Sequence, residues 1–119
     1  MTLPELRSTA IGTIAPKMTF DATRMPEFTA ALPDRPDLVV GGCETHVCVL
    51  QTVLGLLRAG RRILLVRDAV GSRRAESKEA AIRRMERDGA EVVTTEMVLF
   101  EWLETAKDPR LSRVLNLVR

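Results

Sequence analysis

The sequence predicts an α/β fold built around a parallel sheet. Strand-like runs at residues 38–40, 63–66 and 91–93 alternate with helical patterns, which is typical of strands joined by right-handed helical crossovers. The first run is continuously apolar rather than alternating, which indicates a strand covered on both faces. With 119 residues and 45% hydrophobic content, we expect a single domain over residues 1–119.

The N-terminal part of the chain has little periodicity. Prolines and a glycine interrupt residues 1–24, although Ile11–Ala15 could form a short extended segment that leads to Lys17. A short helix is predicted over residues 25–32, because a proline is tolerated in a first turn. The prolines within residues 33–36 then force a loop before the first clear strand.

Residues 37–60 predict a strand, a tight turn and a long helix. Gly41 and Gly42 allow backbone geometry at the turn that a side chain would forbid. We expect Thr45 to be the N-cap of a helix over residues 45–59, which a glycine ends. This helix is apolar on almost every side, so it is either buried in the domain or covered by a partner.

Cys48 would be the third residue of that helix. Unpaired amides and the positive end of the helix dipole favour a thiolate there, and ligands bind at the carboxyl ends of parallel strands. A free cysteine is more often a small buried hydrophobe. The position therefore fits both a nucleophile and a packing residue.

The next strand is predicted at residues 63–66, with Asp68 at the start of a loop. An amphipathic helix follows over residues 76–88, with Glu79 and Arg83 as an i,i+4 ion pair. We expect its buried face to include Ala80, Ile82 and Met85.

Two helices are predicted after the strand at residues 91–93. Thr94 or Thr95 caps the first, in which Trp102 is expected to be a core residue. Asp108, followed by a proline, caps the second. The apolar stripe of this last helix consists of Leu111, Val114, Leu115 and Val118.

Composition argues against several function classes. The 18 basic and 16 acidic residues are well mixed and give a net charge of +2, so no nucleic-acid partner is expected. No run is long enough for a membrane span, and two cysteines without a secretory signal predict a cytoplasmic protein. No GxGxxG or P-loop motif occurs, so no cofactor is expected. Cys43, His46 and Cys48 lack zinc-site spacing, so no metal is expected either.

The strings GGCETHVCVLQT, LLRAGRRILLVRDAVGSR and GAEVVTTEMVLFEWL closely resemble the isochorismatase-like cysteine hydrolase family, and most of all its isochorismatase domain-containing branch. The resemblance runs from about Pro4 to the C-terminus. It implies that Cys48 is the nucleophile and that Lys17 assists it. It also implies a cis peptide between Cys43 and Glu44, and an oxyanion hole formed by the backbone amides of Glu44 and Cys48.

The general-base aspartate of the family has no counterpart in the sequence. In relatives it ends the first strand, which precedes the segment where this chain starts, so the resemblance implies a three-layer α/β/α Rossmann-like sheet that lacks the first strands and helix. Asp21 is a candidate for a replacement carboxylate, whereas Asp68 is expected to be structural. His46 is expected to lie at the surface or the pocket rim, because its side chain points away from that of Cys48.

The resemblance leaves the edge of the strand at residues 38–40 open, because the lost first strand lies beside it in the family. Exposed apolar edges pair with other chains, so we expect a homo-oligomer, a partner that supplies the missing strands, or a poorly stable fragment. The expected function is hydrolysis of small amides or related small molecules. The alternatives are a non-catalytic remnant or assembly subunit, and a start codon assigned too late.

Overall fold

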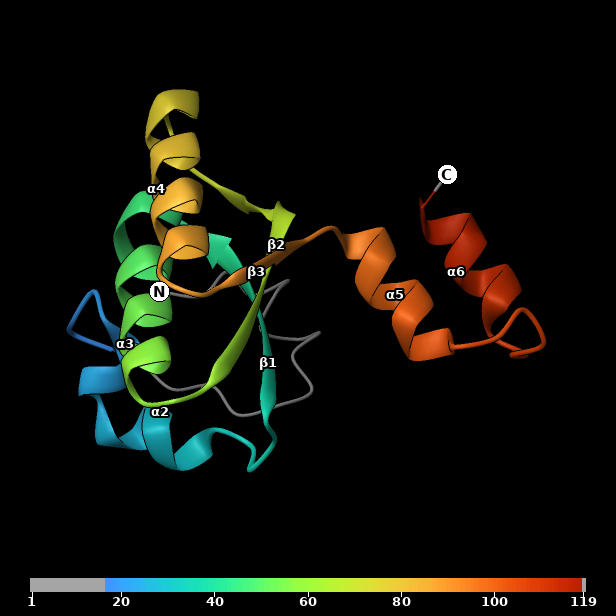
Figure 1. The fold of residues 1–119 in the computed structure, drawn as a ribbon, viewed down its shortest axis with the longest axis horizontal. Coiled ribbons are helices and arrows are strands. Elements are labelled where there is room, and N and C mark those ends of the chain that lie inside the picture. The colour runs from blue at the N-terminus through green and yellow to red at the C-terminus, as the bar shows by residue number, and fades with distance from the viewer. Residues whose placement is uncertain (1–16, 119) are drawn as a thin grey trace.

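The computed structural model describes residues 17–118. The extended segment expected at Ile11–Ala15 lies outside the described residues. Three strands form a parallel sheet in the order β1 (Asp37–Cys43), β2 (Arg62–Gly71) and β3 (Glu91–Val93). Helices flank the sheet (Figure 1), which confirms the predicted α/β class with a parallel sheet.

Helices cover the two faces of the sheet unequally. On one side, α3 (Leu50–Arg58) and α4 (Ala75–Arg87) lie next to each other, and α5 (Thr95–Leu103) and α6 (Leu111–Val118) stand on the other side (Figure 1). The larger core lies beneath α3 and α4. Its fully buried members include Val53, Ile63, Leu65 and Met85.

The core on the α5 side is much smaller. Its buried members are Val66, Val93 and Val98, with Leu64 packed against them. Val39 is the register partner of Leu64 in the sheet, yet it is 43% exposed. The prediction that β1 is covered on both faces is therefore wrong, because α5 reaches β2 and β3 but leaves β1 open on this side.

β2 is longer than the sequence predicted. Instead of ending before a loop at Asp68, it continues to Gly71. The extension is paired, since Gly42 and Cys43 of β1 align with Val70 and Gly71 after a register shift that follows Val40. Asp68 consequently lies within a strand.

Two expectations for α4 need correction. Ala81 is buried and Ala80 is exposed, while Ile82 and Met85 are buried as predicted. The Glu79 carboxylate accepts hydrogen bonds from the Arg67 guanidinium of β2 rather than pairing with Arg83. A partner on the adjacent strand has displaced the local i,i+4 partner.

The prediction that Trp102 belongs to the core is wrong, because its side chain is 65% exposed. Thr94 caps α5 as expected, by accepting a hydrogen bond from the Met97 amide. The helix turns Val98 and Leu103 inward.

The remaining helices are short. η1 (Ala22–Arg24) and α2 (Pro26–Ala31) lead into β1. α6 starts at Leu111, and the turn before it is capped by Asp108 as expected, because the Asp108 side chain accepts from the Arg110 amide and the Asp108 carbonyl accepts from the Leu111 amide. In the predicted apolar stripe Val114 is buried, and the other three residues are half-buried.

Candidate active site

The turn after β1 requires both glycines. A Cβ atom at Gly41 would lie 3.1 Å from the Ala69 carbonyl oxygen of β2, and Gly42 has a φ of +130°, which side chains disfavour. The next peptide bond, between Cys43 and Glu44, is cis, at the position that the resemblance implies. The chain then enters the helix that carries Cys48.

The helix begins differently from the prediction. Thr45 is not an N-cap: it is the first residue of a π-helical turn, η2 (Thr45–Val49), and Glu44 is the residue before the helix. The Thr45 side chain is fully buried, and its Oγ1 has no partner among the described residues. The Glu44 carbonyl accepts from the amides of Val47 and Val49, and such π turns occur frequently at functional sites.

Cys48 lies in this wide turn, half-buried, as its fourth residue. The Lys17 ammonium lies 3.3 Å from the Cys48 Sγ atom. It also donates to the Thr19 carbonyl at 3.0 Å, which fixes the direction of the lysine side chain. The structure thus brings together two side chains separated by 31 residues, and an adjacent cation favours the thiolate form of a cysteine.

A pocket of about 420 Å³ opens beside the two side chains, a size typical of small-molecule sites. Its floor is β1, from Leu38 to Cys43, and the side chains of Phe28, Leu32 and Leu56 form its apolar wall. Thr52 also lines it, but the Thr52 hydroxyl already bonds to the Ala22 amide. No carboxylate or imidazole occurs among its described lining residues.

Two contacts from the loop after β2 hold the turn in place. The Glu44 carboxylate accepts from the Arg73 amide at 3.0 Å and from the Arg73 Nε at 3.3 Å. These bonds, with that of the amide as the main cause, hold the pKa of Glu44 below its usual value. His46 Nδ1 lies 2.9 Å from the Ser72 hydroxyl. His46 thus bonds to the loop after β2, and it is not among the described residues that line the pocket. Sequence reasoning missed Ser72 and Arg73.

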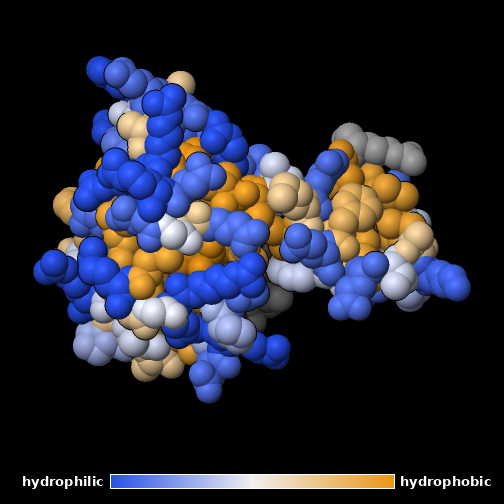
Figure 2. Space-filling model, in the orientation of Figure 1, coloured by the Kyte–Doolittle hydropathy of each residue, from blue (hydrophilic) through white to orange (hydrophobic). Residues whose placement is uncertain are grey.

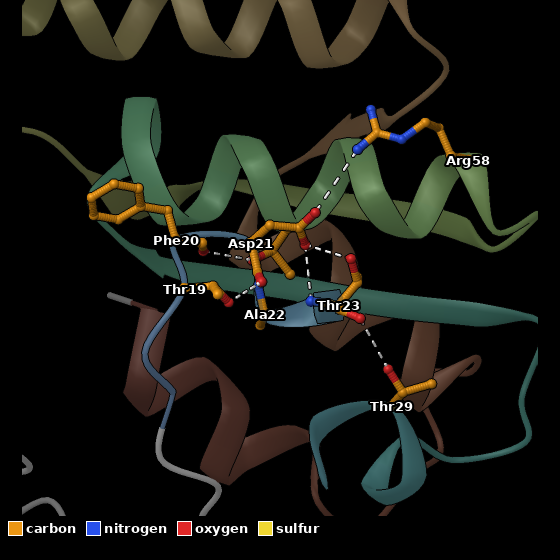
Figure 3. Close-up of polar contacts among 8 residues, drawn as sticks. Thr19, Phe20, Asp21, Ala22, Thr23, Thr29 and Arg58 are labelled. Carbon is orange, nitrogen blue, oxygen red and sulfur yellow. Dashed lines mark hydrogen bonds and ion pairs between the residues drawn. The ribbon is translucent and has the colours of Figure 1, made fainter. Parts of the chain in front are cut away.

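Asp21 does not belong to the site. Its buried carboxylate accepts hydrogen bonds from the amide and hydroxyl of Thr23 and pairs with Arg58 of α3 at 3.8 Å (Figure 3). A Cβ atom at Gly55 would lie 2.9 Å from this carboxylate, so the helix passes close to it. Asp21 therefore caps η1 and docks the segment after Lys17 onto α3. An Asp followed two residues later by Thr is the local signal for this cap.

Asp68 is bonded away from the site, as expected for a structural residue. Its Oδ1 atom accepts from the Thr95 amide at 2.8 Å and from the Thr95 hydroxyl at 2.9 Å. These two bonds, the first in particular, lower the pKa of Asp68. The carboxylate joins β2 to the start of α5.

Two further features of residues 17–118 bear on function. Every helix in this range is too short or too polar to cross a lipid bilayer. In the same range, His, Cys, Asp and Glu side chains do not gather in groups of three that would bind a metal ion.

Comparison with known proteins finds one family and several relatives that match this chain. Residues 2–97 match the isochorismatase domain family. The chain is 33% identical over 121 residues to isochorismatase domain-containing protein 1 of Salmo salar, an alignment that covers 99% of this chain and 42% of that protein. The chain thus spans about two fifths of the length of such curated relatives.

Solved structures agree with this match. The structure of the MAR1 ribonuclease of Caenorhabditis elegans superimposes with a TM-score of 0.86 at 30% identity, over 99% of this chain and 62% of that one. The YcaC protein of Escherichia coli is described as an octameric hydrolase of unknown specificity. Its structure has a TM-score of 0.70 at 27% identity, over 77% of this chain and 47% of that one. With the family match over most of its length, the chain belongs to the isochorismatase domain family.

Proposed function

We propose that the protein is a cysteine hydrolase of small amides or related small molecules. One observation carries the proposal: the Lys17 ammonium contacts the Cys48 sulfur at the end of a pocket of small-molecule size. A thiolate beside a lysine, in the first turn of a helix, is an activated nucleophile. Family membership supports hydrolysis as the reaction class.

The proposed reaction has two stages. The Cys48 thiolate adds to the amide carbonyl carbon, and the carbonyl oxygen becomes an oxyanion that the backbone amides of Glu44 and Cys48 stabilise. The carbon–nitrogen bond then breaks, the departing amine takes a proton from solvent water, and the acyl group remains on Cys48 as a thioester. Water attacks the thioester, which releases the carboxylic acid and regenerates the thiolate. Lys17 stabilises the thiolate and orients the substrate.

The proton transfers lack an assigned general base. No described residue that lines the pocket is acidic, and Asp21 and Asp68 are bonded elsewhere. General acid–base help contributes about 10²- to 10⁴-fold to such reactions. We therefore expect slow turnover by residues 1–119 alone, and faster turnover when a partner strand along β1 brings a carboxylate to the Cys48 end.

Thiol alkylation tests the site without requiring a substrate. The pH dependence of iodoacetamide labelling is measured by mass spectrometry at Cys48 and at Cys43, an exposed free thiol that serves as the internal reference. Labelling of Cys48 that persists below the pH at which Cys43 stops reacting supports the proposal. Identical pH profiles would count against a primed nucleophile.

Hydrolysis itself is tested by ammonia release from a panel of small primary amides. We expect turnover that a Cys48→Ser substitution abolishes. Cys43→Ser is the matched control, because Cys43 lines the same pocket and has no assigned chemical role. Turnover that survives Cys48→Ser would exclude the proposed nucleophile.

The compartment of the protein is proposed from its cysteines. The two thiols are free in the structure, which fits a reducing compartment, and we propose the cytoplasm.

The second candidate is a non-catalytic assembly subunit of the same fold. One observation favours it: β1 is an edge strand of the sheet formed by residues 17–118, and six consecutive β1 residues line the open pocket. An unpaired apolar edge of this length accepts a strand from another chain. Tight association, together with amide turnover no greater than that of Cys48→Ser, would favour this candidate over the hydrolase.

A further inference from the structure

The Thr52 hydroxyl joins the helix that carries Cys48 to the segment that carries Lys17. Its oxygen accepts a hydrogen bond from the Ala22 amide at 2.9 Å, and it donates to the Phe20 carbonyl at 3.4 Å. One side chain of α3 therefore holds the backbone of the segment at two points. Along the helix, Thr52 lies one turn after Cys48.

The direction of these bonds is unusual for a threonine inside a helix. Such a hydroxyl usually faces solvent or bonds to the carbonyl four residues earlier, which for Thr52 is the carbonyl of Cys48. Here it bonds to a different segment of the chain instead. The partner residue Ala22 is buried, and a buried amide that loses its hydrogen-bond partner is costly. The contact therefore fixes where the segment lies on α3.

Two further hydrogen bonds connect this contact to the Lys17 ammonium. The Thr19 hydroxyl donates to the Asp21 carbonyl at 2.6 Å, and the Thr19 carbonyl accepts from the Lys17 ammonium at 3.0 Å. This part of the segment lies against α3 (Figure 3). The ammonium in turn lies 3.3 Å from the Cys48 sulfur. A closed ring thus runs from Cys48 through one turn of helix to Thr52, along the segment to Lys17, and back.

The other polar contact between the segment and α3 is weaker. Arg58 pairs with the Asp21 carboxylate at 3.8 Å, and the arginine side chain is 68% exposed. Exposed ion pairs contribute little to stability. Arg58 is also the last residue of α3, whereas Thr52 lies close to the nucleophile in the sequence. Among the described residues, the Thr52 hydroxyl is therefore the main polar link between the segment and the helix.

We infer that Thr52 is a positioning residue, whose hydroxyl holds Lys17 against the Cys48 sulfur. The inference rests on the role that Lys17 has in the proposed hydrolase. Thr52 lines the pocket, but both of its hydrogen bonds go to the backbone of the segment, so it acts through Lys17. Without the hydroxyl, the Ala22 amide has no partner, and the segment can move away from α3. The ammonium and the sulfur then separate.

The test uses the rate at which iodoacetamide labels Cys48 at neutral pH, divided by the rate at high pH. Because the thiol is ionised at high pH without help from a cation, this labelling ratio removes effects on access to the pocket. Thr52→Val removes the hydroxyl and keeps the shape of the side chain. We expect the ratio to fall, in the same direction as with Lys17→Met. Thr52→Ser keeps the hydroxyl and should keep the ratio of the unchanged protein.

A double variant shows whether Thr52 acts through Lys17. Substitutions that act through one shared contact are not additive. Lys17→Met combined with Thr52→Val is therefore expected to have the same labelling ratio as Lys17→Met alone. A further fall of the ratio in the double variant would mean that Thr52 affects the thiol by another route, and it would overturn the inference.

Two control variants change residues outside the ring. Thr29→Val makes the same chemical change, but the Thr29 hydroxyl bonds to the Thr23 carbonyl at 3.4 Å rather than to α3. Leu117→Ala lies within the apolar surface that gathers over α5 and α6 (Figure 2), on the other side of the sheet from α3. Both variants are expected to keep the labelling ratio. A fall with Thr29→Val equal to that with Thr52→Val would overturn the inference.

The results separate this inference from the proposed hydrolase. Urea unfolding first shows that each variant is folded under the labelling conditions, and Thr52→Ala, which favours the helix, replaces Thr52→Val if valine prevents folding. If the ratio falls with Lys17→Met but not with Thr52→Val, or falls equally with Thr52→Ser, the hydroxyl does not position Lys17, and the hydrolase stands. Labelling requires no turnover, so a chain that hydrolyses no amide can still confirm the role of Thr52.

Discussion

The Glu44 carboxylate and Arg73 join the turn that carries Cys48 to the loop after β2. Glu44 follows the last residue of β1, and it accepts hydrogen bonds from both the amide and the guanidinium of Arg73. No side chain caps the turn itself. The position of the Cys48 sulfur therefore depends on Arg73, which lies 29 positions after Glu44 in the sequence.

Arg73→Ala is expected to slow alkylation of Cys48 by about two- to fivefold, because the guanidinium is exposed and such pairs contribute modestly. The backbone bond to Glu44 remains in this variant. Arg73→Lys should recover part of the rate. Arg74→Ala is the control, since the Arg74 side chain is exposed and makes no polar contact with the turn among the described residues. An equal effect of both alanine variants would contradict a specific role for Arg73.

The pH at which the contact breaks follows from the pKa of Glu44. Hydrogen bonds from Arg73 hold this pKa below its usual value in the folded protein. The contact between Glu44 and Arg73 therefore stabilises the folded state fully above the pKa of an unfolded glutamate. This stabilisation is lost as the pH falls through the lower pKa that Glu44 has in the folded protein. Carboxyl carbon shifts measured by NMR during an acid titration should give a midpoint for Glu44 below the usual value of a glutamate. A midpoint at the usual value would refute this prediction.

Lys17→Met should slow the alkylation of Cys48 at neutral pH, because the variant lacks the ammonium that lies 3.3 Å from the Cys48 sulfur. The rate at Cys43 is expected to change little. At high pH, where both thiols are ionised, the variant and the original protein should react alike. A slower reaction at all pH values would instead indicate that Lys17 only shapes access to the pocket.

Gly55→Ala should destabilise the fold. The added Cβ atom would lie 2.5 Å from the Thr23 hydroxyl and 2.9 Å from the Asp21 carboxylate, and overpacking of this kind costs about 1–3 kcal/mol. Part of this cost is offset by the helix propensity of alanine, about 1 kcal/mol. Urea unfolding measures the net loss. Gly71→Ala is the control, because a Cβ atom there meets nothing within 4 Å, and it should be nearly neutral.

The sequence was sufficient to predict the strand-turn-helix around Cys48, because its signals are local. A double glycine after an apolar run, followed by a long apolar stretch, indicates the same geometry wherever it occurs. The contact of Lys17 with Cys48 was a different case. It joins residues far apart in the chain, so only the resemblance to a known family pointed to it.

The failures have a common physical cause. Thr45 was expected to cap the helix because local propensity favours it, but tertiary packing buries its side chain. Glu79 found its partner on β2 rather than on its own helix. In each case a long-range contact overruled a local preference that was correct on its own terms.

The edge of β1 that the described residues leave unpaired ends beside the Cys48 thiol, and this arrangement makes the protein usable as a sensor of peptides that pair with β1. A peptide that adds to the edge fills the space in front of Cys48, since the same strand lines the pocket. Labelling of that thiol by a fluorescent reagent would then change in proportion to the fraction of protein with a docked peptide. Libraries of extended peptides could be ranked in this way, with Cys43→Ser as the background that leaves a single signal.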